Sequence, residues 1–167
     1  MRIAVVPGVL ALLPRYAGRI DPIPELRDAC LEAVAWLAEA PVVLGDEQGE
    51  QIGRSLADCV RLDAAKSDGE AYLVVANGSA RRTDASPGPY DERALGFDEA
   101  LGKALKGADP AALAGIDQEL ARELWAATAA LPGLAGLLTG TESVSVDYED
   151  APFGVAYWVV RYENAGR

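Results

Sequence analysis

The sequence contains no histidine in its 167 residues. Histidine is the commonest general base near neutral pH and the usual protein ligand of zinc and non-haem iron. Its absence excludes every Ser-His or Cys-His nucleophile pair and every metal site that depends on an imidazole. The commonest routes to hydrolytic and metal-dependent catalysis are therefore closed to this chain.

Cysteine is scarce as well. The two cysteines, Cys30 and Cys59, each fall within a helix-like pattern, and their spacing suits neither a metal site nor a disulfide framework. We therefore predict two buried free thiols and a reducing, cytoplasmic environment. No apolar stretch reaches the length of a membrane span.

Basic residues are outnumbered, with 15 Lys and Arg against 26 Asp and Glu and a formal net charge of −11. Such a charge repels phosphate backbones and anionic lipids, so we expect neither nucleic acid nor a membrane as a partner. Solubility is the simpler interpretation of the charge. The length and the apolar half of the composition predict one globular domain over residues 1–163, followed by a frayed tail at 164–167.

The order of apolar patterns predicts an α/β fold. Short continuous apolar runs predict buried strands at Ile3–Val6, Val42–Leu44 and Tyr72–Ala76. Strands that alternate with helices favour a central, mostly parallel sheet flanked by helices. Two later runs, Ser143–Tyr148 and Gly154–Tyr162, predict a C-terminal β-hairpin.

Helical spacing of apolar residues predicts the helices between these strands. They are expected from Asp21-Pro22 to Pro41, over Gly49–Leu62, over Tyr90–Lys106 and over Gln118–Leu131, with a further turn starting at Asp109-Pro110 and another at Leu134–Leu138. Asp21, Asp109 and Asp117 are expected to start helices, Gly107 to close one in a left-handed conformation, and Pro132-Gly133 to break one. The three tryptophans, Trp36, Trp125 and Trp158, are expected in the core.

Polar residues follow the Tyr72–Ala76 run at once. Because ligands of open α/β sheets bind beyond the carboxyl ends of the strands, this stretch is the candidate ligand-binding site. Its candidate residues are Asn77, Ser79, Arg81, Arg82 and Asp84. Two guanidinium groups suit a small anion that carries a carboxylate or phosphate, although pairing with neighbouring acids is the alternative.

Other patterns give weaker indications. Asp46, Glu47, Asp84 and Asp91 all follow predicted strands, but nothing in their spacing requires a cation, and solvated loop acids are the simpler interpretation. The loop Gly45–Gly49 lacks both the dinucleotide fingerprint and a Walker lysine. We therefore predict no metal, no cofactor and no catalytic residue from these motifs.

Four stretches together resemble a known superfamily. They read VVPGVLALLPRYAG, VANGSARRTDASPGPYDERA, GADPAALAGIDQELARELWAA and VDYEDAPFGVAYWVV. They are similar to an actinobacterial, uncharacterised branch of the class III extradiol ring-cleavage dioxygenases, subunit-B-like. The resemblance covers nearly the whole chain, and its most specific parts are the second and fourth stretches.

The resemblance implies an α/β fold and a cleft at the strand ends, where active members hold Fe(II) with two histidines and a carboxylate. One of those histidines follows the first strand, at a place that corresponds to about Gly8 here. Glycine has no side chain to bind iron, and the other imidazoles are missing too. No catalytic residue is therefore carried over from the family.

Three functional hypotheses remain open. The first is a non-catalytic, metal-free homologue that acts as a binding or assembly module. The second is a metal-independent enzyme in which Arg81 and Arg82 bind a small anionic substrate and Asp84 or Asp91 moves a proton. The third is a homo-oligomer that pairs through an exposed sheet edge formed by Val144–Val146 and Tyr157–Val160.

Overall fold

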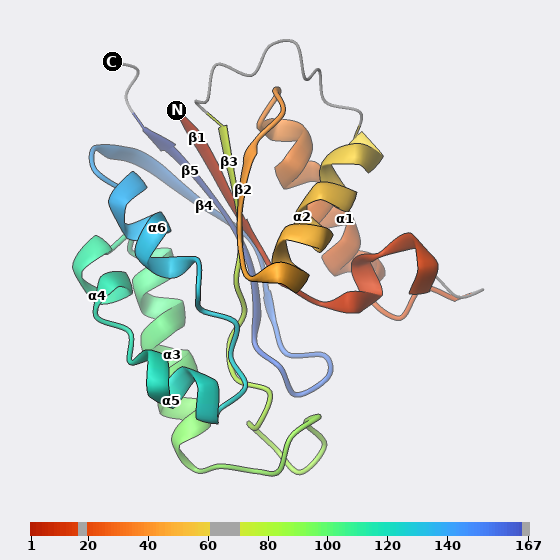
Figure 1. Ribbon diagram of the computed structural model, residues 1–167, viewed down its shortest axis with the longest axis vertical. Helices are drawn as coiled ribbons and strands as arrows, with labels where there is room; N and C mark the ends of the chain where they lie inside the picture. The colour runs from red at the N-terminus through yellow and green to blue at the C-terminus, as the bar shows by residue number, and fades with distance from the viewer. Residues whose placement is uncertain (17–19, 61–70, 165–167) are drawn as a thin grey trace.

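The computed structural model describes residues 1–16, 20–60 and 71–164. Within them, five strands form one sheet in the order β2-β3-β1-β5-β4. The strands are β1 (Arg2–Val6), β2 (Val42–Leu44), β3 (Ala71–Val75), β4 (Thr141–Asp150) and β5 (Tyr157–Asn164). β1, β2 and β3 are parallel, whereas β5 runs antiparallel to both β1 and β4. The predicted α/β fold with its C-terminal hairpin is confirmed (Figure 1).

Helices cover both faces of the sheet (Figure 1). Two short 3-10 turns, η1 (Leu10–Leu12) and η2 (Pro14–Tyr16), lead from β1 towards α1 (Pro24–Trp36), which packs with α2 (Glu47–Val60) on one face. The other face carries α3 (Arg93–Lys106), α4 (Pro110–Ala114), α5 (Gln118–Glu123) and α6 (Leu131–Leu137).

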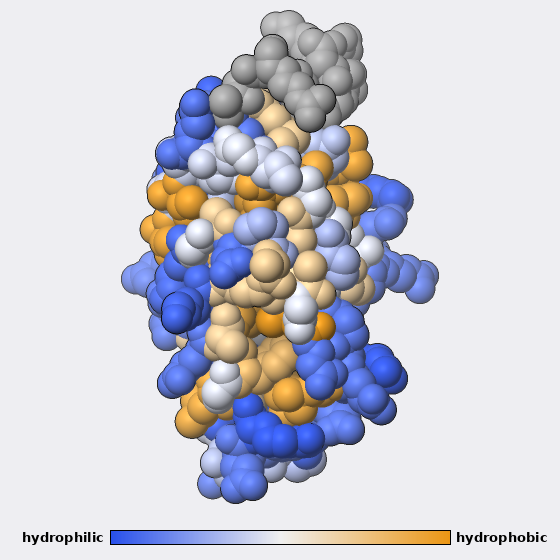
Figure 2. Space-filling view, turned by 90° about the vertical axis from the view of Figure 1, so that its left-hand side faces the viewer, coloured by the Kyte–Doolittle hydropathy of each residue, from blue (hydrophilic) through white to orange (hydrophobic). Residues whose placement is uncertain are grey.

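The central strands are apolar on both faces because both faces are covered. In β1, Ala4 and Val6 join the core cluster under α1 and α2, whereas Ile3 and Val5 join the cluster under α3 to α6. Successive side chains of a strand point to opposite faces, so an uninterrupted apolar run serves two cores at once. On its outer side the layer of α3 to α6 is mixed, with hydrophobic residues down the middle and hydrophilic residues along the borders (Figure 2).

One edge of the sheet is formed by the long strand β4. β5 lies between β1 and β4, so Tyr157–Val160 is interior and the prediction that it forms an exposed edge is wrong. β4 is outermost, and Val144 and Val146 are partly exposed on it. Its pairing with β5 is irregular at two places, a feature that commonly protects sheet edges from pairing with other chains.

The helix predicted over Gln118–Leu131 is wrong in its length. α5 ends at Glu123, and the chain then turns so that Ala127 pairs with Asn77 beyond the end of β3. The alanine-rich sequence has a high helix propensity, but the tertiary pairing overrides it. Pro132 lies in the first turn of α6 and does not break a helix, as its fixed φ and missing N–H allow.

Several smaller predictions were also wrong. α1 begins at Pro24 with no side-chain cap, because the Asp21 carboxylate bonds Ile23 N and Arg27 instead. Gly107 has an ordinary right-handed φ of −86°, and its neighbour Ala108 takes the left-handed conformation at 46°. Asp109 and Asp117 cap α4 and α5 as expected.

Three residues lie in other environments than predicted. Asn164 is not part of a frayed tail, because it ends β5, is buried and donates to Leu137 O at 2.7 Å. Cys30 is buried as predicted, but Cys59 is exposed. Trp125 is 53% exposed, whereas Trp158 is buried. The predictions for residues 61–62, 64–70 and 165–167 lie outside the described residues.

Candidate functional site

A cleft lies beyond the carboxyl ends of β1, β2 and β3. Its volume is about 360 Å³, near the lower end of the range for small-molecule pockets. The first turn of α2 and the connection between α5 and α6 complete its walls. Its lining residues are Gly8, Asp46, Gln48, Gly49, Val75, Asn77, Arg122, Trp125, Ala126 and Ala127.

Asn77 fixes the base of this cleft. β1 and β3 pair in register from Arg2 with Ala71 to Val6 with Val75, so the residues just beyond them are neighbours. The Asn77 amide accepts a hydrogen bond from Gly8 N at 3.2 Å and donates one to Gly78 O at 3.1 Å. Its backbone pairs with Ala127 in both directions, at 3.0 and 3.1 Å. Asn77 is 8% exposed, and its side chain links the loops that follow β1 and β3.

The loop after β2 is held in the same way. Asp46 Oδ1 accepts a hydrogen bond from Gly49 N at 2.7 Å, which satisfies one of the free N–H groups at the start of α2. Gln48 Nε2 donates to Gly8 O at 2.9 Å. These polar groups are therefore bonded to one another across the cleft floor.

In this cleft, Arg122 has free hydrogen-bond donors and Trp125 has exposed apolar surface. Both are exposed, and the Arg122 side chain makes no hydrogen bond or ion pair to any part of the chain that the structure describes. Trp125 has a φ of 57°, an uncommon conformation for a bulky residue and one that marks local strain. Strain of this kind is frequent at ligand sites, and Trp125 is 53% exposed here.

The lining of the cleft does not fit the Fe(II) site that the family resemblance implies. The chain has no imidazole, and a Cβ on Gly8 would lie 3.3 Å from both Asn77 Oδ1 and Val75 Cγ1. The Asp46 carboxylate already serves as the cap of α2. No group of three or more Cys, Asp or Glu side chains is arranged to hold a metal within residues 1–16, 20–60 and 71–164.

Ser79 has a structural role. It is fully buried, and its hydroxyl donates to Leu124 O at 3.1 Å and accepts from Arg81 N at 3.0 Å. Its backbone N–H donates to Asp98 Oδ1 at 2.7 Å. Both hydrogen-bonding functions of the side chain are thus used to hold the loop after β3 in place.

Arg81 is also tied to the protein. Its guanidinium donates to Pro89 O at 2.7 Å and to Glu123 O at 2.8 Å, and it lies 3.6 Å from Asp91. Hydrogen bonds from Arg93 hold the pKa of Asp91 well below its ordinary value, which is opposite to the upward shift that a general base near neutral pH needs. The local pairing considered as the alternative for Arg81 is therefore what the structure contains.

Arg82 meets a carboxylate that the sequence patterns did not single out. Its Nε lies 3.5 Å from Oδ2 of Asp98 on α3, and Asp98 is only 2% exposed. Asp84, in contrast, is exposed and makes no hydrogen bond or ion pair to a described residue. Arg81, Arg82 and Asp84 therefore do not converge, and the pair that forms is Arg82 with Asp98.

Asp98 is a carboxylate near the candidate stretch whose pKa is raised, in contrast to that of Asp91. Its burial raises its pKa to about 6, against the opposing effects of the Ser79 N–H and the Arg82 charge. Oδ1 accepts the Ser79 bond, but no hydrogen-bond donor among the described residues reaches Oδ2. A buried carboxylate oxygen without a donor is uncommon and costly, so it marks a place where the fold tolerates strain.

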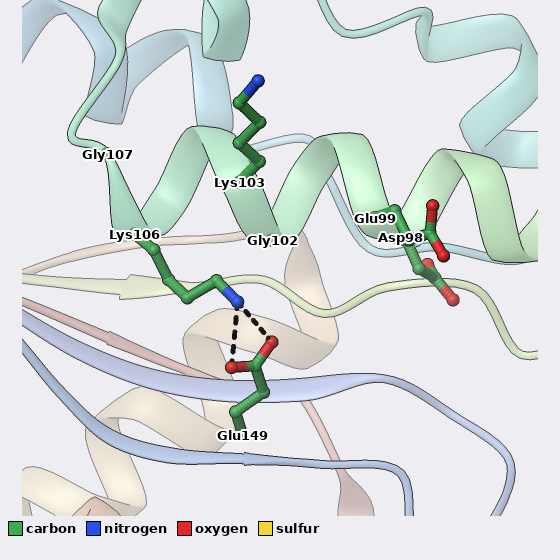
Figure 3. A pocket seen from close by; sticks show the side chains of 7 residues that line it. All are labelled: Asp98, Glu99, Gly102, Lys103, Lys106, Gly107 and Glu149. Carbon is green, nitrogen blue, oxygen red and sulfur yellow. Dashed lines mark hydrogen bonds and ion pairs between the residues drawn. The ribbon is translucent and has the colours of Figure 1, made fainter.

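Two pockets flank this pair. One of about 460 Å³ lies between α3 and β4 and is lined by Asp98, Glu99, Gly102, Lys103, Lys106, Gly107 and Glu149. In it, Lys106 reaches across to Glu149 at 2.7 and 3.0 Å, while Lys103 points away from that pair (Figure 3). The other pocket, of about 170 Å³, includes Arg82 and shares Glu149.

Asp98 and Trp125 were missed for different reasons. Asp98 lies on the buried stripe of α3 with Ala94, Leu101 and Leu105, at separations of four, three and seven residues. An acid on an otherwise apolar stripe was a signal that the sequence offered. Arg122 and Trp125 had no such signal, because they lie in and after a helix whose end is set by the Asn77–Ala127 pairing.

Comparison of the sequence with known proteins gives no match to a protein-family model or to a curated protein. Within the described ranges, each helix is too short or too polar to cross a membrane.

Proposed function

We propose that this chain is a non-catalytic, metal-free homologue of the extradiol ring-cleavage dioxygenases that binds a small anionic molecule in the cleft at the ends of β1, β2 and β3. The observation that carries the proposal is the contrast within the cleft lining. Its floor is bonded internally through Asn77, Asp46 and Gln48, while Arg122 and Trp125 keep free surface.

The chemistry of those two side chains favours a flat or small anion. A guanidinium without a partner can form two parallel hydrogen bonds to a carboxylate. An exposed indole offers a large apolar face at a low cost in side-chain entropy. Arg122 would supply the charge and Trp125 the contact area, with the bonded floor acting as a rigid support.

The non-catalytic part of the proposal rests on the chemistry of the residues that line the cleft. Its one carboxylate, Asp46, is bonded to Gly49 N, and the whole sequence lacks the imidazole that would act as a base or hold Fe(II). Neither an activated nucleophile nor a paired acid and base is present among its lining residues. The cleft fits a binding module better than a reaction site.

Trp125 provides a direct test. Tryptophan fluorescence is recorded while benzoate is added, with neutral benzamide as the matched probe. We expect benzoate to change the emission saturably, benzamide to act far more weakly, and Trp125→Phe to remove the change. Arg122→Gln should weaken benzoate binding at least tenfold, whereas Arg54→Gln, an exposed arginine of α2 paired with Glu50, should leave it unchanged.

A second experiment addresses the loss of catalysis. Purified protein is equilibrated with Fe(II) and then mixed with catechol and protocatechuate under air. Stoichiometric iron binding or enzyme-dependent oxygen uptake would overturn the non-catalytic assignment, even if benzoate binds as expected.

Self-association through β4 is a second candidate, favoured by the position of this ten-residue strand at the outer edge of the sheet. An unpaired edge offers N–H and C=O groups to a second copy. Light scattering over a hundredfold range of concentration tests this candidate, and a constant monomer mass would reject it.

A further inference from the structure

The loop after β3 meets α3 and the closing hairpin at a charged junction, which we define as Arg82 and Asp98. Asp98 is 2% exposed, and its Oδ2 has no hydrogen-bond donor among the described residues. Arg82 Nε is 3.5 Å away, close enough for an ion pair but too poorly placed for a hydrogen bond. Arg82 therefore lies beside the Asp98 carboxylate without donating a hydrogen bond to its Oδ2.

Arg82 also lines the pocket of about 170 Å³ beside the hairpin. The guanidinium of Arg82 makes no hydrogen bond to a described residue, and its single ion-pair partner there is Asp98, with Nε 3.5 Å from Oδ2. The pocket shares no lining residue with the cleft that contains Asn77. This pocket is therefore a separate site, and its Arg82 guanidinium still has free hydrogen-bond donors.

We propose that this pocket binds a small monocarboxylate on the guanidinium of Arg82, and that Asp98, which faces the same guanidinium, takes up a proton from the solvent as the anion binds. The proton comes from hydronium or a buffer acid in the solvent and forms an O–H bond on the Asp98 carboxyl group, and no other covalent bond forms or breaks. The anion and the Asp98 carboxylate compete for the positive charge of Arg82. Protonation neutralises Asp98 and so ends this competition.

The lining of the pocket limits the ligand to a small anion of single charge. A volume of about 170 Å³ equals the liquid-phase share of about six water molecules, which suits a carboxylate with a short apolar tail. Ala151, Ala156 and Trp158 supply apolar surface for that tail. Glu149 and Asp150 also line the wall, so a phosphate or a dicarboxylate would meet repulsion.

The two wall acids do not prevent a single charge from binding. The Glu149 carboxylate is bonded to Lys106 and accepts the Trp158 indole N–H at 3.1 Å, which offsets its charge. Asp150 Oδ1 accepts a hydrogen bond from Ala151 N at 2.7 Å. Arg82 remains the charged group in this pocket with unused donors.

Proton uptake follows from the surroundings of Asp98. The charged groups near it are Arg82 from the loop after β3, Glu149 from β4, and Glu99, Lys103 and Lys106 from its own helix. Of these, Arg82 is the charge that lowers the pKa of Asp98, while burial raises it to about 6. An anion that shares Arg82 weakens that lowering effect, so the pKa of Asp98 rises further when the anion binds.

The sign of the pH dependence is then fixed. Because the bound state holds its proton to higher pH than the free state, affinity increases as pH falls from 8 towards 6 and levels off below about 6. Each unit by which the anion raises the pKa of Asp98 gives a tenfold gain in affinity between the two limits.

The test uses acetate, which stays ionised over this range, and acetamide as its neutral counterpart. Binding is followed by NMR at the Ser79 amide, which donates to Asp98, and at Arg82 Nε–H. We expect saturable shifts with acetate, little with acetamide, and a dissociation constant several-fold lower at pH 5.5 than at pH 8. Calorimetry of the wild-type protein in two buffers of different ionisation enthalpy should show net proton uptake near pH 7.

Three variants make the result decisive. Arg82→Gln should abolish the acetate response, and Asp98→Asn should bind acetate with an affinity that no longer depends on pH. Arg54→Gln is the matched surface control. A pH-independent dissociation constant in the wild type, absence of proton uptake, or an unchanged response in Arg82→Gln would each overturn the proposal. Loss of the response in Arg122→Gln would instead place acetate in the cleft and would also overturn it.

Because the two sites have separate reporters, their failures can be told apart. Failure of benzoate to change the Trp125 emission rejects the proposed cleft function and leaves the acetate result standing. The reverse outcome rejects the Arg82 site alone.

Discussion

Two polar regions meet at the carboxyl end of β3, and they differ in how much of their bonding capacity is used. In the cleft, both ends of the Asn77 amide are bonded, to Gly8 N and to Gly78 O. At the Arg82–Asp98 junction, one carboxylate oxygen is bonded to Ser79 N and the other has no donor among the described residues. Residues a few positions apart in one loop thus belong to a region whose buried amide is bonded at both ends and to one that has an unbonded oxygen.

The difference indicates which region is a support and which can respond to its surroundings. A satisfied buried amide contributes to stability and has little left to offer a ligand. A buried charged oxygen without a donor carries an uncompensated desolvation cost, which a proton or a new partner can relieve. We therefore expect changes to the bonded cleft floor to cost a moderate amount of stability, and changes at the junction to alter both stability and its pH dependence.

The largest effect is expected at Gly78, where the loop after β3 passes close to Asp98 of α3. A Cβ there would lie 2.4 Å from Asp98 Oδ1 and 2.8 Å from the Ala156 Cβ, so neither side can yield without moving the loop. Gly78→Ala should lower the free energy of unfolding by about 3 kcal/mol or more, measured by urea denaturation.

Gly96→Ala is the control for that substitution. Nothing lies within 4 Å of a Cβ at Gly96 in α3, so the change should raise stability by about 0.5–1 kcal/mol through helix propensity. A Gly78→Ala protein as stable as the wild type would show that the junction is not tightly packed.

The next effect is the pH dependence contributed by Asp98. Its pKa is 3.8 when unfolded and about 6 when folded, so the folded state binds more protons between these values. Stability from this group is therefore greatest at low pH and falls as pH rises from about 4 to about 6, by up to about 3 kcal/mol. Above about 6 its contribution is constant.

Asp98→Asn isolates that contribution because asparagine resembles the protonated acid and keeps an acceptor for Ser79 N. The difference in the free energy of unfolding between variant and wild type should grow in favour of the variant from pH 4.5 to 6.5 and then stay flat, as urea denaturation at four pH values would show. A difference that is constant over this range would mean that Asp98 titrates normally.

The sequence predicted the frame of both regions but not the junction itself. Continuous apolar runs and the strand–helix order were enough to predict that β1 and β3 are parallel and that Gly8 and Asn77 lie at the same sheet end. These features depend on local pattern and on general rules of topology. Which arginine remains available depends on contacts between distant segments, such as Arg81 with Glu123 O, and no local pattern encodes them.

The wrongly predicted helix over residues 118–131 has the same cause. Its alanine-rich sequence carries no breaker before Pro132, and the turn at Trp125 exists because Ala127 pairs with Asn77 across the fold. One tertiary contact therefore set both the helix boundary and the position of two cleft residues. Asp98 differs, since an acid on the apolar stripe of α3 was visible in the sequence.

A smaller effect is expected from Asn77→Ala in the cleft. The substitution leaves Gly8 N and Gly78 O without their side-chain partners, which should cost about 1–2 kcal/mol of unfolding free energy. It should also weaken benzoate binding at the cleft while leaving the acetate response of the Ser79 amide in place. Gln48→Ala, which removes one exposed bond to Gly8 O, is the control and should cost less than about 0.5 kcal/mol. Loss of both responses would mean that the two regions are one unit.

The smallest effect is expected at Gly8, on the other side of the same amide. A Cβ there would lie 3.3 Å from Asn77 Oδ1 and from Val75 Cγ1, so both neighbours need to move by only a few tenths of an ångström. Gly8→Ala should therefore change the free energy of unfolding by less than about 1 kcal/mol, because only a weak hydrogen bond and one methyl contact are disturbed. The informative quantity is its ratio to the cost of Gly78→Ala, measured in the same denaturant series. If the two glycines prove equally intolerant of a methyl group, the cleft is packed as tightly as the junction, and the unsatisfied oxygen of Asp98 no longer distinguishes the two.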